Sequence, residues 1–509
     1  MAHDRLSTLT SWHSDWKGLR VGVLGLGKTG FSVADTLVEL GAEVLIVAQR
    51  ADEAQVRLVE VIGAALVLDE QLAAAPVQLV ELRPEVLVVS PGFHPDHPVL
   101  EWAGEHGIPV WGDVELAWRL RDKVLTNADG SNRAPAEWIA VTGTNGKTTT
   151  VQLTATMLVE GGFRAAPCGN IGIPILDAIR DPQGFDVLVV ELSSYQLHST
   201  FSMSPYSAVC LNLAEDHLDW HGSFDAYADA KARVYTNTKV ACVYNRSDAR
   251  TESMVENADV VEGARAVGFG LGVPGPSDVG IVDGILCDRA FIDDRRTAAR
   301  EITTVADLAA RGLGAPHTVA NVLAAAALAR SFGVSVEAIR RALARFELDH
   351  HRIELVASAD GVSWVNDSKA TNAHAANASL GAFDSVVWIA GGLLKGVDVD
   401  PLIRGRAGRL RAVVLIGTER ETLRKAFERH APGVPVFEVD HTETEEVMSA
   451  AVRLAAAVAL AGDVVLLAPA AASMDQFVDY SDRGTRFAQA VRDLLGGGAA
   501  DEHDAPPRG

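Results

Sequence analysis

Short runs of β-branched and other apolar residues recur along the whole chain, and a stretch with helical spacing follows most of them. The runs are continuous rather than alternating, which is typical of strands that helices cover on both faces. Strands and helices in alternation predict an α/β fold with largely parallel sheets. The predicted strands are RVGVLG, EVLIV and EVLVVS in a first group, WIAVTG, DVLVVE, YSAVCLN and KVACVYN in a second, and WVNDS, SVVWIAGG, RAVVLIG and DVVLLAP in a third.

Three groups of strands in 509 residues indicate three domains of ordinary size. A polar segment, TNADGSNRAPAE, separates the first two groups, and a second weak point follows the helical stretch VEAIRRALARF. The first and third domains are predicted to be Rossmann-like, and the second to be a mononucleotide-binding domain of the P-loop type. The predicted domains are residues 1–133, 134–348 and 349–497, followed by a disordered tail at 498–509.

Composition excludes several classes of protein. The formal net charge of −22 argues against a nucleic-acid partner. No apolar stretch reaches the roughly 18 uncharged residues of a membrane helix, and the N-terminus lacks the pattern of a secretory signal. The four cysteines are far apart and form no CxxC pair, which argues against a disulfide framework or a zinc site. These features favour a cytoplasmic protein without a membrane partner.

A phosphate-binding loop is the strongest single motif. The sequence TGTNGKTTT follows the apolar run WIAV and precedes a helical stretch, which is the context that a P-loop needs. Its glycines let backbone N–H groups approach phosphates, Lys147 can reach the β- and γ-phosphates, and Thr148 can offer a hydroxyl to magnesium. The glycine of the full Walker pattern is replaced by Val141, and an ordinary glycine turn is the alternative. The residues predicted to bind the nucleotide are Gly143, Thr144, Asn145, Gly146, Lys147, Thr148 and Thr149.

A second glycine motif, Gly25 to Gly30, follows the run RVGVL and opens a helical stretch. It resembles a dinucleotide fingerprint, which also needs an acid at the end of the next strand. That strand ends in Ala48-Gln49-Arg50, and the later Asp52 is expected to cap a helix. The nicotinamide interpretation is therefore disfavoured, although the domain is expected to bind a phosphorylated ligand. A uridine diphosphate sugar offers the same kind of diphosphate. A ligand-free Rossmann-like turn stays an alternative.

Taken together, the motifs resemble those of the Mur ligase family over nearly the whole chain. Within that family, DSKATN and ASMDQF are similar to the branch that uses D-glutamate, and the diaminopimelate signature Asp-Asn-Pro-Arg is absent. The matching motifs, in order, are Gly25–Gly30, Ser90–Gly92, Gly112-Asp113, the phosphate loop, Gly169–Gly172, Glu191–Leu197, Glu215–Asp219, Lys231, His317 with Asn321, Asn366–Asn372, Gly391–Lys395 and Pro469–Phe477.

The resemblance implies a cytoplasmic, monomeric, ATP-dependent ligase of peptidoglycan precursor synthesis. Its members join a carboxylate to an amine, which is uphill in water, by first converting the carboxylate to an acyl phosphate with ATP. The implied substrates are UDP-N-acetylmuramoyl-L-alanine and D-glutamate, with Mg²⁺ at two sites. The third domain is expected to close over ATP and to bring in D-glutamate.

Residue roles follow from the same resemblance. It implies catalytic roles for Lys147, His217, Lys231 and Arg352. It implies metal binding by Thr148, Glu191, His217 and Lys231, with Lys231 carbamylated to give an anionic oxygen ligand. Taken alone, Lys231 is typical of an exposed helix lysine, His217 of a structural histidine and Glu191 of a helix-capping acid.

Further contacts are implied for the nucleotide and for both substrates. Nucleotide contacts are implied for Asn321, Arg352, Asp367 and Lys369. Substrate contacts are implied for Gly27, Thr29, Ser90, Asn170, Ser193, Gln196, Thr371, Lys395, Ser473 and Tyr480, with Lys395 matching the charge of a glutamate carboxylate. The chain departs from the family at Ala48 and Gln49, where an acid and a threonine for uracil are common, and at Thr318, where asparagine often stands.

Three alternatives stay open at this point. An NAD-dependent oxidoreductase would explain the first glycine motif but not the phosphate loop, Glu191 or Lys395. A non-catalytic nucleotide-binding regulator would be expected to lack some of Lys147, Glu191, His217 or Lys231, and all are present. A folylpolyglutamate-type ligase shares the phosphate loop but is disfavoured by DSKATN and by the predicted N-terminal Rossmann-like domain.

Overall fold

The chain folds into an α/β protein built on three largely parallel sheets, as the sequence predicts. The structure, a computed structural model, describes residues 2–127, 129–348, 351–440 and 444–497. The predicted tail at 498–509 lies outside the described residues, as do two residues at the predicted boundary between the second and third domains. Close packing groups the chain into two compact units, Met1–Leu213 with Asp225–Phe346, and Ala214–Phe224 with Glu347–Gly509.

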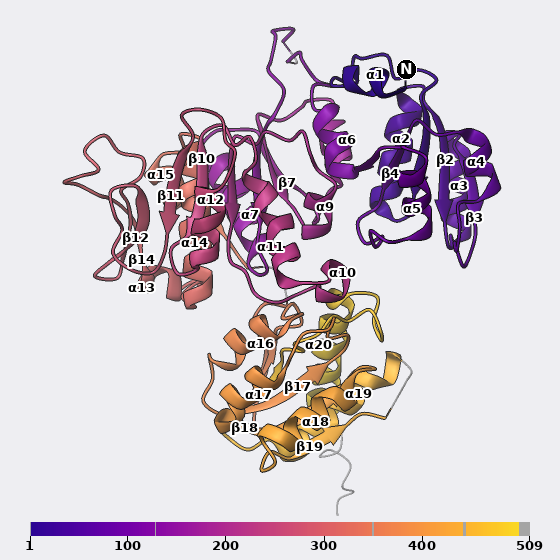
Figure 1. Cartoon of the computed structure of the whole chain (residues 1–509). Coiled ribbons are helices and arrows are strands. Elements are labelled where there is room, and N and C mark those ends of the chain that lie inside the picture. The colour runs from indigo at the N-terminus through magenta and orange to yellow at the C-terminus, as the bar shows by residue number, and fades with distance from the viewer. Residues whose placement is uncertain (1, 128, 349–350, 441–443, 498–509) are drawn as a thin grey trace, which may run out of the picture. The chain divides into compact units, whose positions relative to one another are not determined.

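The first unit begins with a five-stranded parallel sheet in the order β3-β2-β1-β4-β5 (Figure 1). Helix α2 packs through Val33 and Leu37 on one face of this sheet, and α4 and α5 pack through Leu79 and Val99 on the other. Two covered faces explain the continuous apolar runs. The elements are β1 (Arg20–Leu24), β2 (Glu43–Ala48), β3 (Ala65–Leu68), β4 (Val86–Val89), β5 (Val110–Gly112), α1 (Ala2–Thr8), α2 (Lys28–Glu39), α3 (Glu53–Ile62), α4 (Val77–Leu82), α5 (Pro98–Glu105) and α6 (Asp113–Arg119).

A nine-stranded sheet in the order β14-β13-β12-β11-β10-β9-β6-β8-β7 forms the rest of the first unit. Its strands are β6 (Glu137–Thr142), β7 (Ala165–Gly169), β8 (Val187–Glu191), β9 (Ser207–Cys210), β10 (Ala241–Asn245), β11 (Arg265–Phe269), β12 (Asp278–Val282), β13 (Ile285–Asp288) and β14 (Arg300–Thr304). Its helices are α7 (Lys147–Glu160), α8 (Ile175–Ile179), α9 (Ser194–His198), α11 (Phe224–Ala232), η1 (Arg233–Tyr235), α12 (Ala249–Glu256), α13 (Val305–Ala309), α14 (Pro316–Ser331) and α15 (Val336–Arg345).

Only the β12–β13 and β13–β14 pairings in this sheet are antiparallel. The strands β12 and β13 therefore form a hairpin, in a stretch of the chain that is rich in Gly, Pro and Asp.

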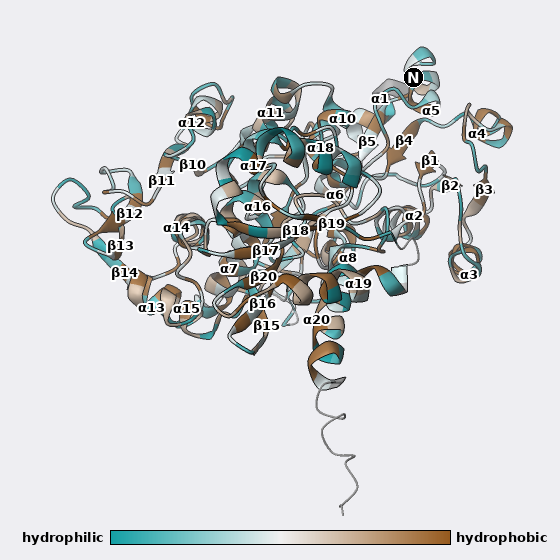
Figure 2. Ribbon diagram, turned by 90° about the horizontal axis from the view of Figure 1, so that it is seen from below, coloured by the Kyte–Doolittle hydropathy of each residue, from teal (hydrophilic) through white to brown (hydrophobic). Residues whose placement is uncertain are grey.

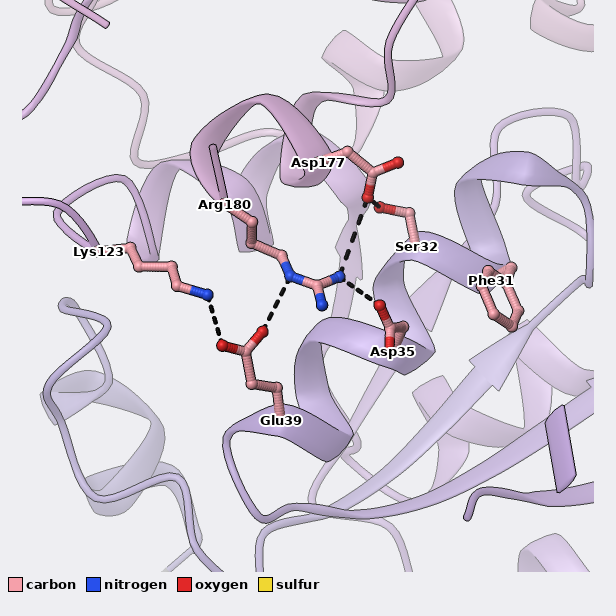
Figure 3. Close-up of a pocket in the computed structure, with 7 residues that line it drawn as sticks. All are labelled: Phe31, Ser32, Asp35, Glu39, Lys123, Asp177 and Arg180. Atoms are coloured by element: carbon pink, nitrogen blue, oxygen red, sulfur yellow. Dashed lines mark hydrogen bonds and ion pairs between the residues drawn. The ribbon is translucent and has the colours of Figure 1, made fainter. Parts of the chain in front are cut away.

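A cluster of charged side chains joins α2 to α8 within the first unit (Figure 3). Arg180 on α8 donates to Asp35, and its Nε lies 2.9 Å from Glu39 Oε2. Glu39 also pairs with Lys123, while Ser32 donates to Asp177. One arginine therefore neutralises carboxylates from two helices that lie far apart in the sequence.

The second unit holds a six-stranded sheet in the order β15-β16-β20-β17-β18-β19, of which only β15 runs antiparallel to its neighbour. Apolar residues cover both faces, and in Figure 2 the strands β17 and β20 are coloured as hydrophobic. The elements are α10 (Leu218–His221), β15 (Glu354–Ala359), β16 (Val362–Asn366), α16 (Ala373–Leu380), β17 (Val386–Gly391), α17 (Asp400–Arg406), η2 (Ala407–Arg409), β18 (Leu410–Ile416), α18 (Arg420–His430), β19 (Val436–Glu438), α19 (Thr444–Val458), β20 (Val464–Leu467) and α20 (Tyr480–Gly497). Across the described residues, no helix is both long enough and apolar enough to cross a membrane.

Candidate active site

The predicted phosphate loop connects β6 to the N-terminus of α7. Gly143 and Gly146 have φ angles of +144° and +85°, which L side chains rarely adopt. A Cβ at Gly143 would lie 2.9 Å from the Leu211 Cβ, so this position also has no room for a side chain. The loop can therefore present backbone N–H groups and the positive end of a helix dipole to an anion.

Two residues that the sequence did not single out hold this loop in place. The amide N–H of Asn145 donates to Asn212 Oδ1 at 2.9 Å, and Asn212 Nδ2 donates back to the Asn145 carbonyl at 3.0 Å. The hydroxyls of Thr144 and Tyr227 lie 2.9 Å apart and are buried. Tyr227 lies one helical turn before Lys231 on α11, and this spacing is the signal that could have identified it.

Lys147 lies at the first position of α7 and folds back over its own loop. Its Nζ donates to the carbonyls of Gly143 and Thr144, at 2.8 Å in both cases. The ammonium group is thus held beside the backbone amides that could bind phosphate oxygens. A lysine side chain is flexible, so rotation about its bonds can turn the ammonium group from these carbonyls to a phosphate.

Thr148 and Glu191 meet at the end of strand β8. The Thr148 hydroxyl donates to Glu191 Oε2 at 3.0 Å, and Asn170 Nδ2 donates to Glu191 Oε1 at 3.1 Å. Glu191 is only 2% exposed, and Thr149 beside Thr148 is also buried. In the described part of the chain, no group of three or more His, Cys, Asp and Glu side chains could hold a metal ion. One hydroxyl and one carboxylate still suit Mg²⁺, which usually takes its other ligands from water and nucleotide phosphates.

Lys231 is buried, with 2% exposure, unlike the exposed helix lysine that this residue taken alone would suggest. Its Nζ donates to the Gly143 carbonyl at 3.0 Å and to Thr142 Oγ1 at 3.3 Å. The sequence missed this burial because α11 has little amphipathic pattern, with small residues around the lysine. A buried amine beside the phosphate loop fits the carbamylated ligand that the family resemblance implies, since a buried cation is costly.

Asn321 on α14 lies against the phosphate loop. A Cβ at Gly146 would come within 2.4 Å of Asn321 Oδ1, so glycine is needed at 146 for two reasons, its φ angle and this contact. The structure thus brings a residue predicted to contact adenine together with the predicted phosphate site, although 175 positions separate Asn321 from Gly146 in the sequence.

Ser193 and Gln196 form hydrogen bonds with each other. They form a capping box at the start of α9, with the Gln196 N–H donating to Ser193 Oγ at 3.1 Å. Gln196 Nε2 donates to Asp113 Oδ2 at 3.0 Å. Asp113 is fully buried at the start of α6, and burial raises the pKa of its carboxyl to about 6, the hydrogen bond from Gln196 opposing the rise.

The first glycine motif forms the turn between β1 and α2. Gly27 is exposed and Thr29 is half-buried, whereas Ser90 Oγ is buried beside the turn. A Cβ at Gly30 would lie 2.1 Å from the Gly25 carbonyl oxygen, so close packing requires glycine there. Asp52 caps α3 through a capping box, which confirms its expected role.

The second unit contains His217, which the sequence grouped with the metal-binding residues of the first unit. His217 precedes α10 in left-handed conformation, with φ of +55°. Lys395 also has a positive φ, +56°, and its Nζ lies 3.0 Å from Asp216 Oδ1 and 3.5 Å from His217 Nε2. Asn372 Nδ2 donates to Asp216 Oδ2 at 3.2 Å. Asp216, absent from the predicted site residues, is therefore the carboxylate that Lys395 contacts.

The remaining predicted residues of the second unit lie in its loops, except Tyr480, which begins α20. Asp367 is buried, which raises the pKa of its carboxyl, while hydrogen bonding to Ser379 and the charge of Arg352 act in the opposite direction. Lys369 Nζ lies 3.6 Å from the centre of the Tyr480 ring, a cation–π contact between two predicted site residues. Thr371 is half-buried, and Ser473 is buried.

Three domain families match the chain. The Mur ligase MurD-like N-terminal domain matches residues 19–112, the Mur ligase middle domain matches 141–329, and the Mur ligase glutamate ligase domain matches 351–471. These ranges follow the three sheets in order.

Similar proteins span almost the full chain. The UDP-N-acetylmuramoylalanine–D-glutamate ligase of Leifsonia xyli subsp. xyli is 66% identical over 509 residues, which covers 99% of this chain and 98% of the relative. The protein of the same name from Streptomyces avermitilis is 52% identical over 484 residues, covering 94% of this chain and 99% of the relative.

Solved structures share the fold at lower identity. A pseudomurein peptide ligase type C from Methanothermus fervidus has a TM-score of 0.57 and 16% identity, and covers 93% of this chain and 100% of its own. The MurF ligase from Thermotoga maritima in complex with ADP has a TM-score of 0.52 and 17% identity, and covers 94% and 96%.

Proposed function

Because this chain belongs to the Mur ligase family, we propose that it joins D-glutamate to UDP-N-acetylmuramoyl-L-alanine in an ATP-dependent step of peptidoglycan precursor synthesis. The observation that carries the proposal is the phosphate loop, in which Thr148 contacts the buried Glu191 and Lys231 contacts Gly143. The choice of substrates rests on relatives of that name, which are up to 66% identical over nearly the whole chain. We also propose that the protein acts as a monomer in the cytoplasm.

The proposed reaction has two bond-forming steps. A carboxylate oxygen of the alanyl group attacks the γ-phosphorus of ATP, and the bond to ADP breaks. The amine of D-glutamate then attacks the acyl carbon, phosphate leaves, and the amine loses a proton. The products are the amide, ADP and phosphate, so the energy of ATP hydrolysis drives an otherwise unfavourable condensation.

The residues of the first unit suit phosphate binding and charge stabilisation. Amides of the loop, including those of Gly143 and Gly146, would bind phosphate oxygens, and Lys147 would turn from the loop carbonyls to the transferring phosphoryl group. Thr148, Glu191 and carbamylated Lys231 would hold Mg²⁺, which supplies Lewis-acid stabilisation of the phosphate charge when bound. Asn321 lies against Gly146 and would contact the nucleotide. Ser193, Gln196 and Asn170, with Gly27, Thr29 and Ser90, would contact the UDP-sugar substrate.

The second unit would supply the amino-acid substrate and the remaining polar groups. Thr371, Lys395, Ser473 and Tyr480 would hold D-glutamate, with Lys395 changing its partner from Asp216 to a glutamate carboxylate. Arg352, Asp367 and Lys369 would contact the nucleotide phosphates, and His217 would bind near a second Mg²⁺. The domain ranges 1–133, 134–348 and 349–497 stand as part of this proposal.

Phosphate release tests the proposal directly. With ATP and UDP-N-acetylmuramoyl-L-alanine, we expect release with D-glutamate, and little with L-glutamate, L-alanine or diaminopimelate. Lys147→Ala should abolish it, because the phosphoryl group loses its positive partner. If the purified protein never splits ATP with both substrates, or if it uses another amino acid equally well, the proposed function is wrong.

A further inference from the structure

Arg483 is the least exposed charged side chain in the second unit, with 0% exposure. It lies on the first turn of α20 and contacts two loops that carry predicted site residues. Its Nε donates to Ser368 Oγ at 3.0 Å, one Nη to the Ser368 carbonyl at 2.9 Å, and the other Nη to the Ala471 carbonyl at 3.1 Å. One side chain therefore bonds both the 366–372 loop and the 469–477 loop.

The three hydrogen-bond acceptors of Arg483 are all neutral. Among the residues that the structure describes, no carboxylate forms an ion pair with Arg483. Burial lowers the pKa of its guanidinium to about 9, while the charge of Asp475 acts in the opposite direction. A buried cation without a paired anion is costly, and mutation to an apolar residue of similar size would remove that cost. A buried, unpaired arginine is therefore expected where its positive charge contributes to the binding of an anionic ligand.

Backbone bonds connect the same two loops to the loop that carries Lys395. The N–H of Leu393 donates to the Ala472 carbonyl at 2.9 Å, and the N–H of Ala472 donates back at the same distance. The Ala470 N–H donates to the Ala370 carbonyl at 3.0 Å. Hydrogen bonds thus connect the loops of Thr371, Lys395 and Ser473 to one another. Arg483 donates hydrogen bonds to two of these three loops.

We propose that Arg483 is a positioning residue that sets the preference for an acidic amino acid: it holds the 366–372 and 469–477 loops together, and its unpaired buried charge attracts the carboxylates of the incoming amino acid. The inference rests on the proposed function, because it assigns the D-glutamate site to these loops. Arg483 itself does not touch the substrate, since its donors bond to Ser368 and Ala471.

Steady-state kinetics on the full chain test this role. Arg483→Gln removes the charge and should raise the KM for D-glutamate at least about tenfold, which corresponds to about 1.4 kcal/mol, while the KM for ATP stays within about twofold. Arg483→Lys keeps the charge and should restore the KM to within about threefold. Ser368→Ala loses one acceptor of Arg483 and should raise the KM for D-glutamate about two- to fivefold.

Arg486 provides the matched control. It lies one turn later on α20 and pairs with Asp482 at 2.8 Å, so Arg486→Gln removes an equal charge outside the two loops. We expect its KM for D-glutamate to be unchanged. Circular dichroism and thermal unfolding identify variants that do not fold.

The outcomes separate the inference from the proposed function. A folded Arg483→Gln variant with an unchanged KM for D-glutamate would overturn the inference, as would equal rises in every KM, which indicate general loosening. If Arg483→Gln does not fold, the other two variants decide. The inference is overturned if Ser368→Ala leaves the KM for D-glutamate unchanged. It is also overturned if Arg483→Lys folds but shows no activity with D-glutamate. If the wild-type protein releases no phosphate from ATP when D-glutamate is added, the proposed function is refuted instead.

Discussion

At the scale of single residues, Asp113 carries a measurable pH signature. Burial raises the pKa of its carboxyl from 3.8 to about 6, so between these values the folded state binds a proton that the unfolded state has lost. Its contribution to the free energy of unfolding is therefore full below pH ~4, and it is lost as the pH rises through ~6. A shift of this size corresponds to about 2–3 kcal/mol.

Asp113→Asn should remove this dependence, because an amide stays neutral and can still accept from Gln196. Between pH 4 and pH 7, we expect the free energy of unfolding of the variant to rise by about 2–3 kcal/mol relative to that of wild type. The measurement is urea unfolding at several pH values. Glu53→Gln on the exposed surface of α3 is the control and should follow wild type. The assignment is wrong if the difference between Asp113→Asn and wild type does not change with pH.

The role of Lys231 could not be predicted from its neighbours in the sequence, because they gave no sign that it is buried. Its neighbours Ala230 and Ala232 in AYADAKARVY gave no local sign that the lysine points to the phosphate loop. The phosphate loop itself was predictable, because a strand, two glycines and a helix follow one another within the sequence. The contact between Lys231 and Gly143, by contrast, joins residues 88 positions apart. Only the family resemblance, which implies a metal-binding role for Lys231, singled out this lysine.

The proposed carbamate makes a further prediction at Lys231. Lys231→Ala should lose ATP-dependent phosphate release by at least about a hundredfold, because an anionic ligand for Mg²⁺ is removed. An added short carboxylic acid that fits the vacated space should restore part of the activity. Lys239→Ala, a partly exposed lysine paired with Glu137, is the control and should retain activity. Full activity of Lys231→Ala would refute the role of this lysine.

At the scale of elements, most interior strands were predicted, but the interior strands β11, β12 and β13 and the strands at the sheet edges were not. All eleven predicted runs form strands, among them β6, β8 and β9 beside the phosphate loop. The strands at the six edges of the three sheets, β3, β5, β7, β14, β15 and β19, are missing from the prediction. Edge strands are paired on one side only and are often short or partly exposed. The run ALVL of β3 is apolar but partly exposed, and β5 and β19 have only three residues each.

The charged cluster between α2 and α8 makes a prediction about these elements. Arg180→Gln leaves Asp35, Glu39 and Asp177 without their shared cation, so we expect a loss of about 1–3 kcal/mol from the free energy of unfolding. Added salt should reduce this loss, since the cluster is partly exposed. The measurement is urea unfolding at low and high ionic strength.

Arg57 offers the control for that cluster. It forms a single exposed pair with Glu53 on α3, so Arg57→Gln should cost less than about 0.5 kcal/mol. Equal losses in Arg180→Gln and Arg57→Gln would contradict a networked cluster. The KM for ATP should stay unchanged in both variants, because neither residue contacts the phosphate loop.

At the scale of the whole molecule, the predicted site residues are distributed over two compact units. The predicted site residues come from the order of motifs along the chain. This order did not predict that residues 214–224, with His217, group with the second unit although they lie between β9 and α11 of the first. Periodicity and spacing describe neighbours in sequence, whereas this grouping depends on the bonds of Asp216 to Lys395 and Asn372.

This distribution leads to a prediction that needs both units. If one ATP molecule contacts Lys147 and Asn321 in the first unit and Asp367 and Lys369 in the second, nucleotide binding should slow hydrogen exchange in both 143–149 and 366–371. The measurement is exchange mass spectrometry with a non-hydrolysable ATP analogue and Mg²⁺. The hairpin β12–β13 should show no change and is an internal control. Protection confined to 143–149 would show that the second unit binds no part of the nucleotide, and the roles proposed for Arg352, Asp367 and Lys369 would then be wrong.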